Sequence, residues 1–254
     1  MSNDILVSMQ EDLERAKKRS PQQRRWAMLI DLRKCVGCHA CTIGCVSENK
    51  LPPGHYYRPV KEYSRGKYPH LSTTYLARPC MHCDKPPCVD ACPVPGKDGA
   101  TWKETDGTGA GLVMINYTKC IGCGQCVPAC PYEARKLDEG KSFTQTSPAP
   151  QQYEMMPSFE YGKAWPRKGE EPPIGKARKC HFCVHRLAEA ALPVCTSTCI
   201  GRATYFGDEN DPESVIAQTL KFNAGNIQVL KPSKGTSPRV YYIANVKLEN
   251  VYGK

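Results

Sequence analysis

Residues 120–131 read Cys-Ile-Gly-Cys-Gly-Gln-Cys-Val-Pro-Ala-Cys-Pro, and this spacing occurs in related form four times along the chain. Every group of four cysteines opens C-x2-C and closes C-x3-C, with an inner gap of two, four, two and eleven residues in chain order. The sixteen cysteines are Cys35, Cys38, Cys41, Cys45, Cys80, Cys83, Cys88, Cys92, Cys120, Cys123, Cys126, Cys130, Cys180, Cys183, Cys195 and Cys199. No cysteine is left over, so the pattern indicates four metal centres with four thiolate ligands each.

Disulfides and structural zinc are the competing interpretations. Disulfides between cysteines this close would close tiny strained loops, and no cleavable secretory signal opens the chain. A four-cysteine zinc site usually takes two separated C-x2-C pairs, whereas C-x2-C-x2-C-x3-C packs three ligands onto one tight loop and sends the fourth elsewhere. That run is typical of bacterial ferredoxins, in which the fourth cysteine binds the neighbouring iron–sulfur cluster. We therefore expect iron and sulfide, with a multi-zinc binding module as the distant alternative.

An internal repeat surrounds the cysteines. Residues 28–41 resemble residues 113–126, and residues 77–83 resemble residues 177–183. In the first pair, a short apolar run of strand type leads through a polar turn into the cysteine loop. The sequence therefore predicts an α+β chain of two bacterial-ferredoxin-like modules in a pseudo-twofold relation, with a small strand insertion and long loops.

The expected domain organisation follows from these modules and from the segments between them. We expect a charged N-terminal segment (1–25), an outer module (26–60 with 177–210), an inner module (76–136), a proline-rich insert (137–176) and a C-terminal helix with strands (211–254). The insert holds six prolines and little periodicity, which predicts an extended surface segment that serves as a connector or a docking arm.

Local patterns predict the remaining elements. The expected helices cover about 11–19 and 211–221, the second with Asp211 as N-cap and Pro212 at its first position. Residues 99–111 read as a loop because glycine and threonine dominate them. The expected strands cover 56–63, 71–77, 229–230 and 240–245.

Charge and hydropathy exclude several classes of function. The formal net charge of +10 resembles a nucleic-acid signal, but four oxidised 4Fe–4S centres at about −2 each would bring it to about +2. We therefore expect no nucleic-acid partner. No stretch approaches the roughly 20 apolar residues of a membrane span, so we expect no direct span.

Three histidines lie within the cysteine groups, namely His39, His82 and His181. They could donate hydrogen bonds to cluster sulfurs, but we favour solvent-facing loop positions for them. No Ser-His-Asp, paired-carboxylate or glycine-rich phosphate-binding pattern stands out. We therefore expect an electron-transfer chain with no substrate site of its own.

The order of the four groups, with Ile30-Asp31 ahead of the first and residues 199–207 after the last, resembles a known family. It is similar to the four-cluster iron–sulfur subunit of molybdopterin oxidoreductases, the dimethyl sulfoxide reductase family, which includes the small subunits of polysulfide, thiosulfate, tetrathionate and arsenate reductases. The resemblance covers about residues 26–245, and it is weak in the first 25 residues and in the insert. It implies four 4Fe–4S clusters, with the last cysteines exchanged within each module. The four implied ligand sets are Cys35, Cys38, Cys41 and Cys199; Cys45, Cys180, Cys183 and Cys195; Cys80, Cys83, Cys88 and Cys130; and Cys92, Cys120, Cys123 and Cys126.

The resemblance also implies partners and a place in the cell. The expected partners are a large molybdopterin-containing catalytic subunit and an integral membrane quinone-reactive anchor subunit, in an anaerobic respiratory-type complex. The chain would then be peripheral on the cell membrane through its partners, on the extracytoplasmic (periplasmic) face, with the cytoplasmic face as the alternative. A polyferredoxin-like subunit of a hydrogenase or formate dehydrogenase is the redox alternative.

Overall fold

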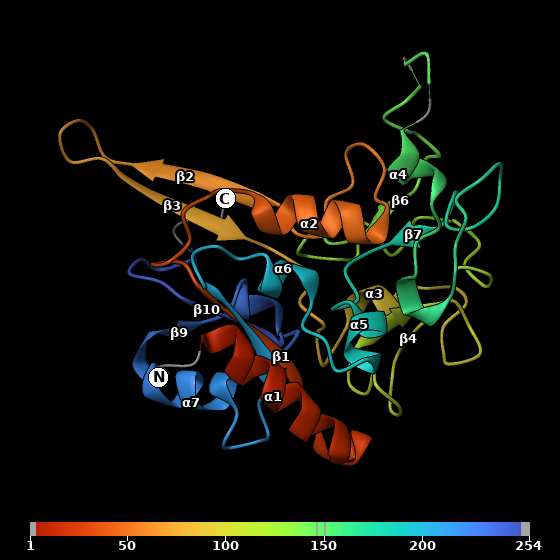
Figure 1. Cartoon of the computed structure of the whole chain (residues 1–254). Helices are drawn as coiled ribbons and strands as arrows, with labels where there is room; N and C mark the ends of the chain where they lie inside the picture. The colour runs from red at the N-terminus through yellow and green to blue at the C-terminus, as the bar shows by residue number, and fades with distance from the viewer. Residues whose placement is uncertain (1–3, 146, 150, 250–254) are drawn as a thin grey trace.

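The apolar run ahead of the first cysteine group forms β1 (Trp26–Asp31), an inner strand of the main sheet (Figure 1). In the computed structural model, which describes residues 4–145, 147–149 and 151–249, all six residues of β1 are buried. β1 pairs antiparallel with β8 (Thr204–Asp208) and parallel with β10 (Val240–Ile243), and β9 (Ile227–Gln228) completes the order β8-β1-β10-β9. The sheet therefore joins the segments that precede the first cysteine group and follow the last one.

Helix α1 (Ile5–Lys18) packs against this sheet through Met9, Leu13 and Ala16, which are buried at helical spacing. The expected start near residue 11 is wrong, because the Asp4 carboxylate accepts a hydrogen bond from the Leu6 N–H (3.0 Å) and begins the helix there. The charged segment is therefore a docked helix, seen beside β1 in Figure 1.

Helix α7 (Val215–Phe222) also packs on the sheet, and its start differs from the expected one. Ser214 is the N-cap, since its hydroxyl accepts a hydrogen bond from the Ala217 N–H (3.2 Å). Asp211 instead accepts from the Glu213 N–H within the preceding turn (3.1 Å). The helix was predicted, but its cap was misassigned.

Three two-stranded ladders surround the cysteine loops. The expected hairpin is present as β2 (Val60–Arg65) and β3 (Ser72–Ala77), with shifted edges, and Figure 1 shows it projecting from the body. β4 (Thr101–Lys103) pairs with β5 (Val113–Ile115), so the loop expected over 99–111 is wrong at its start. The third ladder joins β6 (Lys136–Leu137) to β7 (Ala177–Arg178) and closes the base of the insert. The late strands are at 227–228 and 240–243, so the strand expected at 229–230 is displaced.

The other helical segments are short. Four helices contain cysteines or follow one directly, namely α2 (Ala40–Asn49), α3 (Pro87–Asp90), α5 (Val184–Ala188) and α6 (Val194–Ser197). The rest are α4 (Gln152–Met155) and the 3-10 turns η1 (Pro21–Gln23), η2 (Glu160–Gly162), η3 (Ala224–Asn226) and η4 (Pro232–Lys234). The described chain is thus a mixed α and β protein with small sheets, compatible with ferredoxin-like 4Fe–4S domains.

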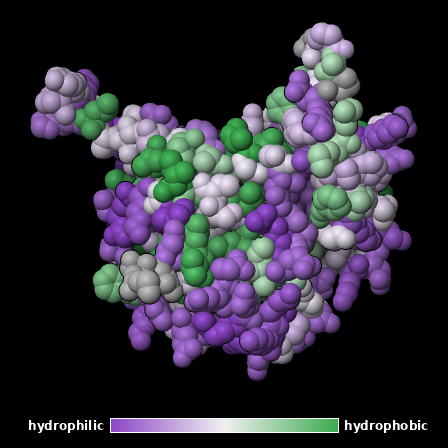
Figure 2. Space-filling view, in the orientation of Figure 1, coloured by the Kyte–Doolittle hydropathy of each residue, from purple (hydrophilic) through white to green (hydrophobic). Residues whose placement is uncertain are grey.

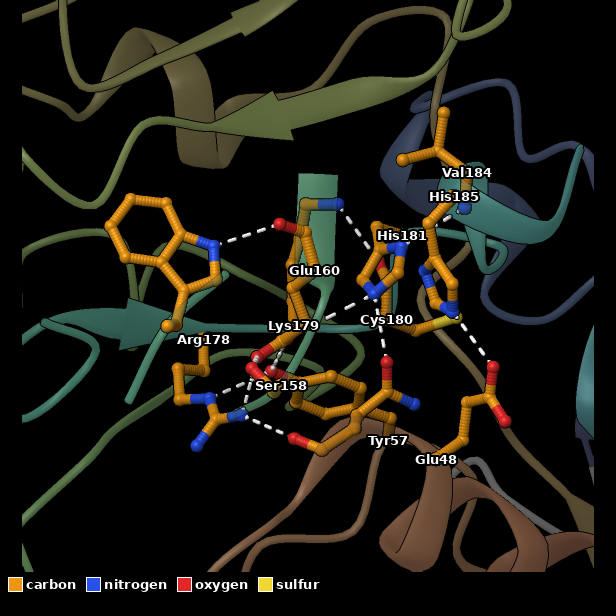
Figure 3. Close-up of polar contacts among 12 residues, drawn as sticks. Glu48, Tyr57, Ser158, Glu160, Arg178, Lys179, Cys180, His181, Val184 and His185 are labelled. Atoms are coloured by element: carbon orange, nitrogen blue, oxygen red, sulfur yellow. Dashed lines mark hydrogen bonds and ion pairs between the residues drawn. The ribbon is translucent and has the colours of Figure 1, made fainter. Parts of the chain in front are cut away.

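The proline-rich insert is only partly the surface segment that was expected. Pro150 lies outside the described residues, as do residues 250–254 of the expected C-terminal part. Ser158, Glu160 and Trp165 are buried, and the Trp165 indole donates a hydrogen bond to the Glu160 carbonyl (2.8 Å). The expectation is therefore wrong at the middle of the insert, because a polar cluster anchors it to the body (Figure 3).

Arg178 is the centre of that cluster. Its fully buried guanidinium pairs with the Glu160 carboxylate and with the Asp138 carboxylate (2.8 Å), and both carboxylates are fully buried. It also donates to the Tyr57 hydroxyl (3.0 Å). The start and the middle of the insert and a segment after α2 therefore meet at the Arg178 guanidinium.

Replacing Glu160 with Ala should destabilise the fold strongly. The change removes one partner of a buried ion pair, which costs about 3–5 kcal/mol in comparable cases. Unfolding by guanidinium chloride, followed by far-ultraviolet circular dichroism, should reach its midpoint at a lower denaturant concentration than in the wild type. Glu139→Ala is the matched control, because Glu139 pairs with Lys141 on the surface. Equal midpoints for the two variants would contradict a structural role for the buried pair.

Candidate metal centres

The structure gathers the sixteen cysteines into four groups of four, and none of the sixteen is in a disulfide. Cys35, Cys38 and Cys41 line one cavity together with Cys199, which follows α6. Burial raises the pKa of the Cys35 thiol, and the neighbouring thiols of Cys41 and Cys199 raise it further. The first cavity therefore combines the first sequence group with the last cysteine of the fourth.

The second group forms around Cys45 on α2, which packs against α6. Burial raises the pKa of the Cys45 thiol well above its usual value. The next contributions come from three buried thiols of the fourth sequence group, Cys183, Cys180 and Cys195. Four thiols from two distant segments thus lie close together without solvent around them.

The third group contains Cys80, Cys83, Cys88 and Cys130. Burial raises the pKa of Cys83 to about 12, and the thiols of Cys80, Cys88 and Cys130 contribute to this rise. Burial likewise raises the pKa of Cys88 to about 11. Such thiols are difficult to ionise unless a bound metal supplies positive charge, because ligation requires the thiolate.

The fourth group lines a second cavity, with Cys120, Cys123 and Cys126 from one loop and Cys92 from the preceding sequence group. Ala177 of β7 and Arg135 complete the wall. As in the other three groups, one cysteine comes from a different part of the chain than the other three.

The cysteine groups of the described residues lack the geometry of a single-ion site. Four thiolates around one zinc lie about 3.8 Å apart, given Zn–S bonds of about 2.3 Å. Over 4–145, 147–149 and 151–249, no three His, Cys, Asp or Glu side chains are close enough to hold one ion. A four-iron cubane holds its cysteine sulfurs farther apart, around a body of its own. The donor set therefore suits 4Fe–4S clusters.

Backbone amides support the thiolates in every group. The N–H groups of Ala203, Phe182, Ala134 and Ala177 donate to the sulfurs of Cys199 (3.2 Å), Cys180 (3.4 Å), Cys130 (3.4 Å) and Cys120 (3.5 Å), respectively. Such bonds stabilise the negative charge on sulfur and tune the potential of a bound cluster. The loops are thus shaped for ligation and not only for packing.

Two of the three histidines differ from expectation. His39 is exposed as expected, but His82 and His181 are buried, so their expected solvent-facing positions are wrong. His82 Nδ1 accepts the Val113 N–H (3.1 Å), and His181 Nδ1 accepts the Val184 N–H (3.1 Å) (Figure 3). Burial lowers the pKa of both imidazoles well below the usual value, so both are neutral and serve the backbone.

Three buried cations near the cysteines were not predicted from the sequence. Arg58, Arg135 and Lys179 are 1%, 2% and 0% exposed, respectively. Only Lys179 is next to a cysteine in the sequence, and this adjacency is the one local pattern that could have pointed to any of the three. The other two come to the cysteine groups through the fold.

Replacing Gly122 with Ala should disturb the fourth group specifically. Gly122 has φ +74°, and a Cβ there would be 2.4 Å from the Gly175 carbonyl oxygen, so the loop must move. We expect iron per chain to fall from about sixteen to about twelve, the loss of one 4Fe–4S centre. Gly169→Ala is the matched control, with φ +61° and no atom within 4 Å of the added Cβ. Equal iron contents in both variants would show that the close approach to Gly175 is unimportant.

Comparison with known proteins agrees with this chemistry. Residues 71–147 and 165–209 match the family model of a 4Fe–4S dicluster domain. A selenate reductase subunit from Mesobacillus selenatarsenatis is 49% identical over 95% of this chain and 80% of its own length. A tetrathionate reductase subunit from Salmonella typhimurium is 39% identical over 87% of this chain and 73% of its own length. The arsenate respiratory reductase iron–sulfur subunit of Shewanella sp. strain ANA-3 is 33% identical over 90% of this chain and all of its own length.

The described part of the chain contains no helix that is long and apolar enough to cross a bilayer.

The dicluster match and the sixteen cysteines fit four 4Fe–4S clusters, as the sequence predicted. The chain therefore belongs to the 4Fe–4S dicluster family of reductase iron–sulfur subunits, together with the selenate, tetrathionate and arsenate reductase subunits that it resembles.

Proposed function

We propose that this chain is the electron relay of a multi-subunit reductase and that each of the four thiol groups holds one 4Fe–4S cluster. The bound clusters would supply one-electron redox chemistry. The proposed ligand sets, numbered one to four, are Cys35, Cys38, Cys41 and Cys199; Cys45, Cys180, Cys183 and Cys195; Cys80, Cys83, Cys88 and Cys130; and Cys92, Cys120, Cys123 and Cys126. The observation that carries the proposal is the grouping of the sixteen thiols by fours, with an exposed cysteine in the first and in the fourth group.

Contacts between successive sets support their arrangement in a row. Arg58 lines the cavity of the first set and lies 3.9 Å from the Cys195 sulfur of the second. After burial and Cys195, the thiol of Cys80 in the third set is the next cause that raises the pKa of Cys180 in the second, to about 12. Arg135 lines the cavity of the fourth set, and the Cys88 thiol of the third raises its pKa. These links support the order one, two, three and four for the proposed sets.

Exposure supports entry and exit at the two ends of the row. Cys38 of the first set and Cys123 of the fourth are exposed, whereas all four cysteines of the second set are buried. Exposed apolar side chains stand beside both ends, with Val36, Ile43 and Ile200 near the first set and Ile121 near the fourth. Figure 2 shows apolar side chains gathered over α2 and the base of the β2–β3 hairpin. Such surfaces suit partner subunits that cover the terminal clusters.

The relatives are named as subunits of reductases, which supports partner subunits for this chain. We propose a molybdopterin-containing catalytic subunit at one end and an integral membrane quinone-reactive subunit at the other, with the chain on the extracytoplasmic face. The selenate, tetrathionate and arsenate reductase relatives favour an oxyanion as the substrate of the catalytic partner. The chemistry on that substrate would belong to the partner and not to this chain.

We further propose that the two modules are related by a pseudo-twofold axis. The repeat of residues 28–41 and 113–126 supports this, since β1 leads into the first cysteine group as β5 leads into the third. The parts 26–60 with 177–210 and 76–136 remain the proposed module boundaries.

Substituting Cys45 tests the exchanged ligands. Wild-type protein should hold about sixteen iron atoms and sixteen sulfides, four per centre. Cys45→Ser and Cys180→Ser should perturb the same electron paramagnetic resonance signal, because both belong to the second set, and Cys35→Ser should perturb a different one. If Cys45→Ser and Cys35→Ser alter the same single signal, the exchange is wrong.

Substituting Cys123 tests the relay in the intact complex. Cys123→Ser should abolish oxyanion reduction driven by quinol, because loss of the fourth cluster interrupts the row. Reduction driven by a small artificial dye that reaches the catalytic subunit directly should remain. Quinol-linked turnover that stays unchanged after verified loss of that cluster would reject the relay function, and stoichiometric zinc in place of iron would reject the cofactor.

A further inference from the structure

Arg58 and Arg135, at 1% and 2% exposed, differ in their surroundings from three other buried arginines. Arg78, Arg178 and Arg239 each pair with a carboxylate. Within the part of the chain that the structure describes, Arg58 and Arg135 form no ion pair with a carboxylate, and the Nε of each has no hydrogen-bond partner. A buried charge without a counter-charge costs several kcal/mol, so these two sites require a negative neighbour.

The surroundings of Arg58 point to that neighbour. Its guanidinium donates to the Thr204 hydroxyl (2.7 Å) and lies against the Cys195 sulfur (3.9 Å). Although burial lowers the pKa of Arg58, the thiols of Cys195 and Cys41 raise it above the usual value. Cys195 belongs to the second proposed set and Cys41 to the first, so Arg58 lies between them.

Arg135 occupies the same kind of place between the other two sets. It donates to the Thr101 hydroxyl (2.9 Å), and its side chain lines the cavity of the fourth set. Although burial lowers its pKa, the thiols of Cys88 in the third set and Cys126 in the fourth raise it. Each ferredoxin-like pair of sets therefore has one buried arginine that lines a cysteine cavity of that pair and interacts electrostatically with both sets.

We propose that Arg58 and Arg135 are fixed counter-charges, one for each pair of clusters, that raise the reduction potentials of both clusters in the pair. The inference rests on the proposed ligand sets. Arginine suits this role because its guanidinium stays protonated under all physiological conditions. A positive charge between two clusters favours the added electron on either one and lessens the repulsion when both are reduced. The effect should therefore be shared by two clusters and absent from the other two.

Lys179 is linked to both pairs. Its ammonium donates to the Cys180 carbonyl (2.8 Å). Burial lowers the pKa of Lys179, and the Cys80 thiol of the third set is the next cause and acts in the opposite direction. Figure 3 places it beside Cys180. Arg58 and Arg135 provide a sharper test than Lys179, because each arginine should act on one pair of clusters and not on the other pair.

The experiment is a potentiometric titration of the cluster-loaded chain in the complex with which it purifies. Electron paramagnetic resonance follows the four clusters, assigned with one Cys→Ser variant per set. Arg58→Gln should lower the potentials of the first and second clusters and leave the third and fourth unchanged; Arg135→Gln should do the reverse. We expect at least a tenfold change in the ratio of reduced to oxidised cluster at fixed potential, about 59 mV for one electron. Each variant is the control for the other.

Lysine variants separate charge from packing. Arg58→Lys and Arg135→Lys keep the charge, so their potentials should stay near those of the wild type. Arg24→Gln is a further control, since Arg24 is buried but contacts Trp26 and the Gly107 carbonyl instead of cysteines. It should leave all four potentials unchanged.

Each outcome decides the inference. Unchanged potentials in both Gln variants, equal shifts in all four clusters, or Lys variants that shift as much as the Gln variants would overturn it. If a Gln variant loses clusters, retention of all four in the matching Lys variant supports the role of charge, and loss in both overturns it. Wild-type protein without four clusters would instead refute the proposed function.

Discussion

Burial of cysteine thiols in close groups is the constraint on which the rest of this structure depends. Sixteen cysteines lie in four tight groups, and burial together with like neighbours holds several of their pKa values far above the ordinary range. Without bound metal, the buried cysteine thiols would remain protonated and could not act as ligands. Bound iron removes the difficulty, because each centre supplies positive charge and a rigid body around which the loops close. We therefore expect folding and cluster insertion to be coupled, as in other small metal domains.

The protein framework has two tasks under this constraint. It brings cysteines from distant segments together, through the β1–β8 pair and the β6–β7 ladder, and it neutralises the charge that remains. Backbone N–H groups act on one sulfur in each group. The Arg178 cluster acts farther out, where it fixes the middle of the insert against the segment that carries Cys180 (Figure 3).

A relay also requires differences along its length. In the proposed row, the two end sets each have an exposed cysteine, Cys38 and Cys123, while the cysteines of the second set are buried. Enclosure keeps water away from the inner centres, and the arginines between sets compensate for the negative charge that water would otherwise screen. This division between exposed ends and a shielded middle agrees with membership of a family of reductase iron–sulfur subunits, whose catalytic chemistry belongs to other chains.

The sequence by itself determined the number of centres, their ligand type, the strand ahead of each ferredoxin-like run and the family, because these depend on spacing over a few residues. The exchange of ligands between groups came from the family resemblance and stays a proposal. Tertiary structure alone decided the burial of His82 and His181, the anchoring of Glu160 and the places of Arg58 and Arg135. None of these has a local signal, since an exposed loop histidine and a buried one have the same neighbours in sequence. Their environment includes side chains from other segments, such as Cys195 beside Arg58, and only the folded chain brings those together.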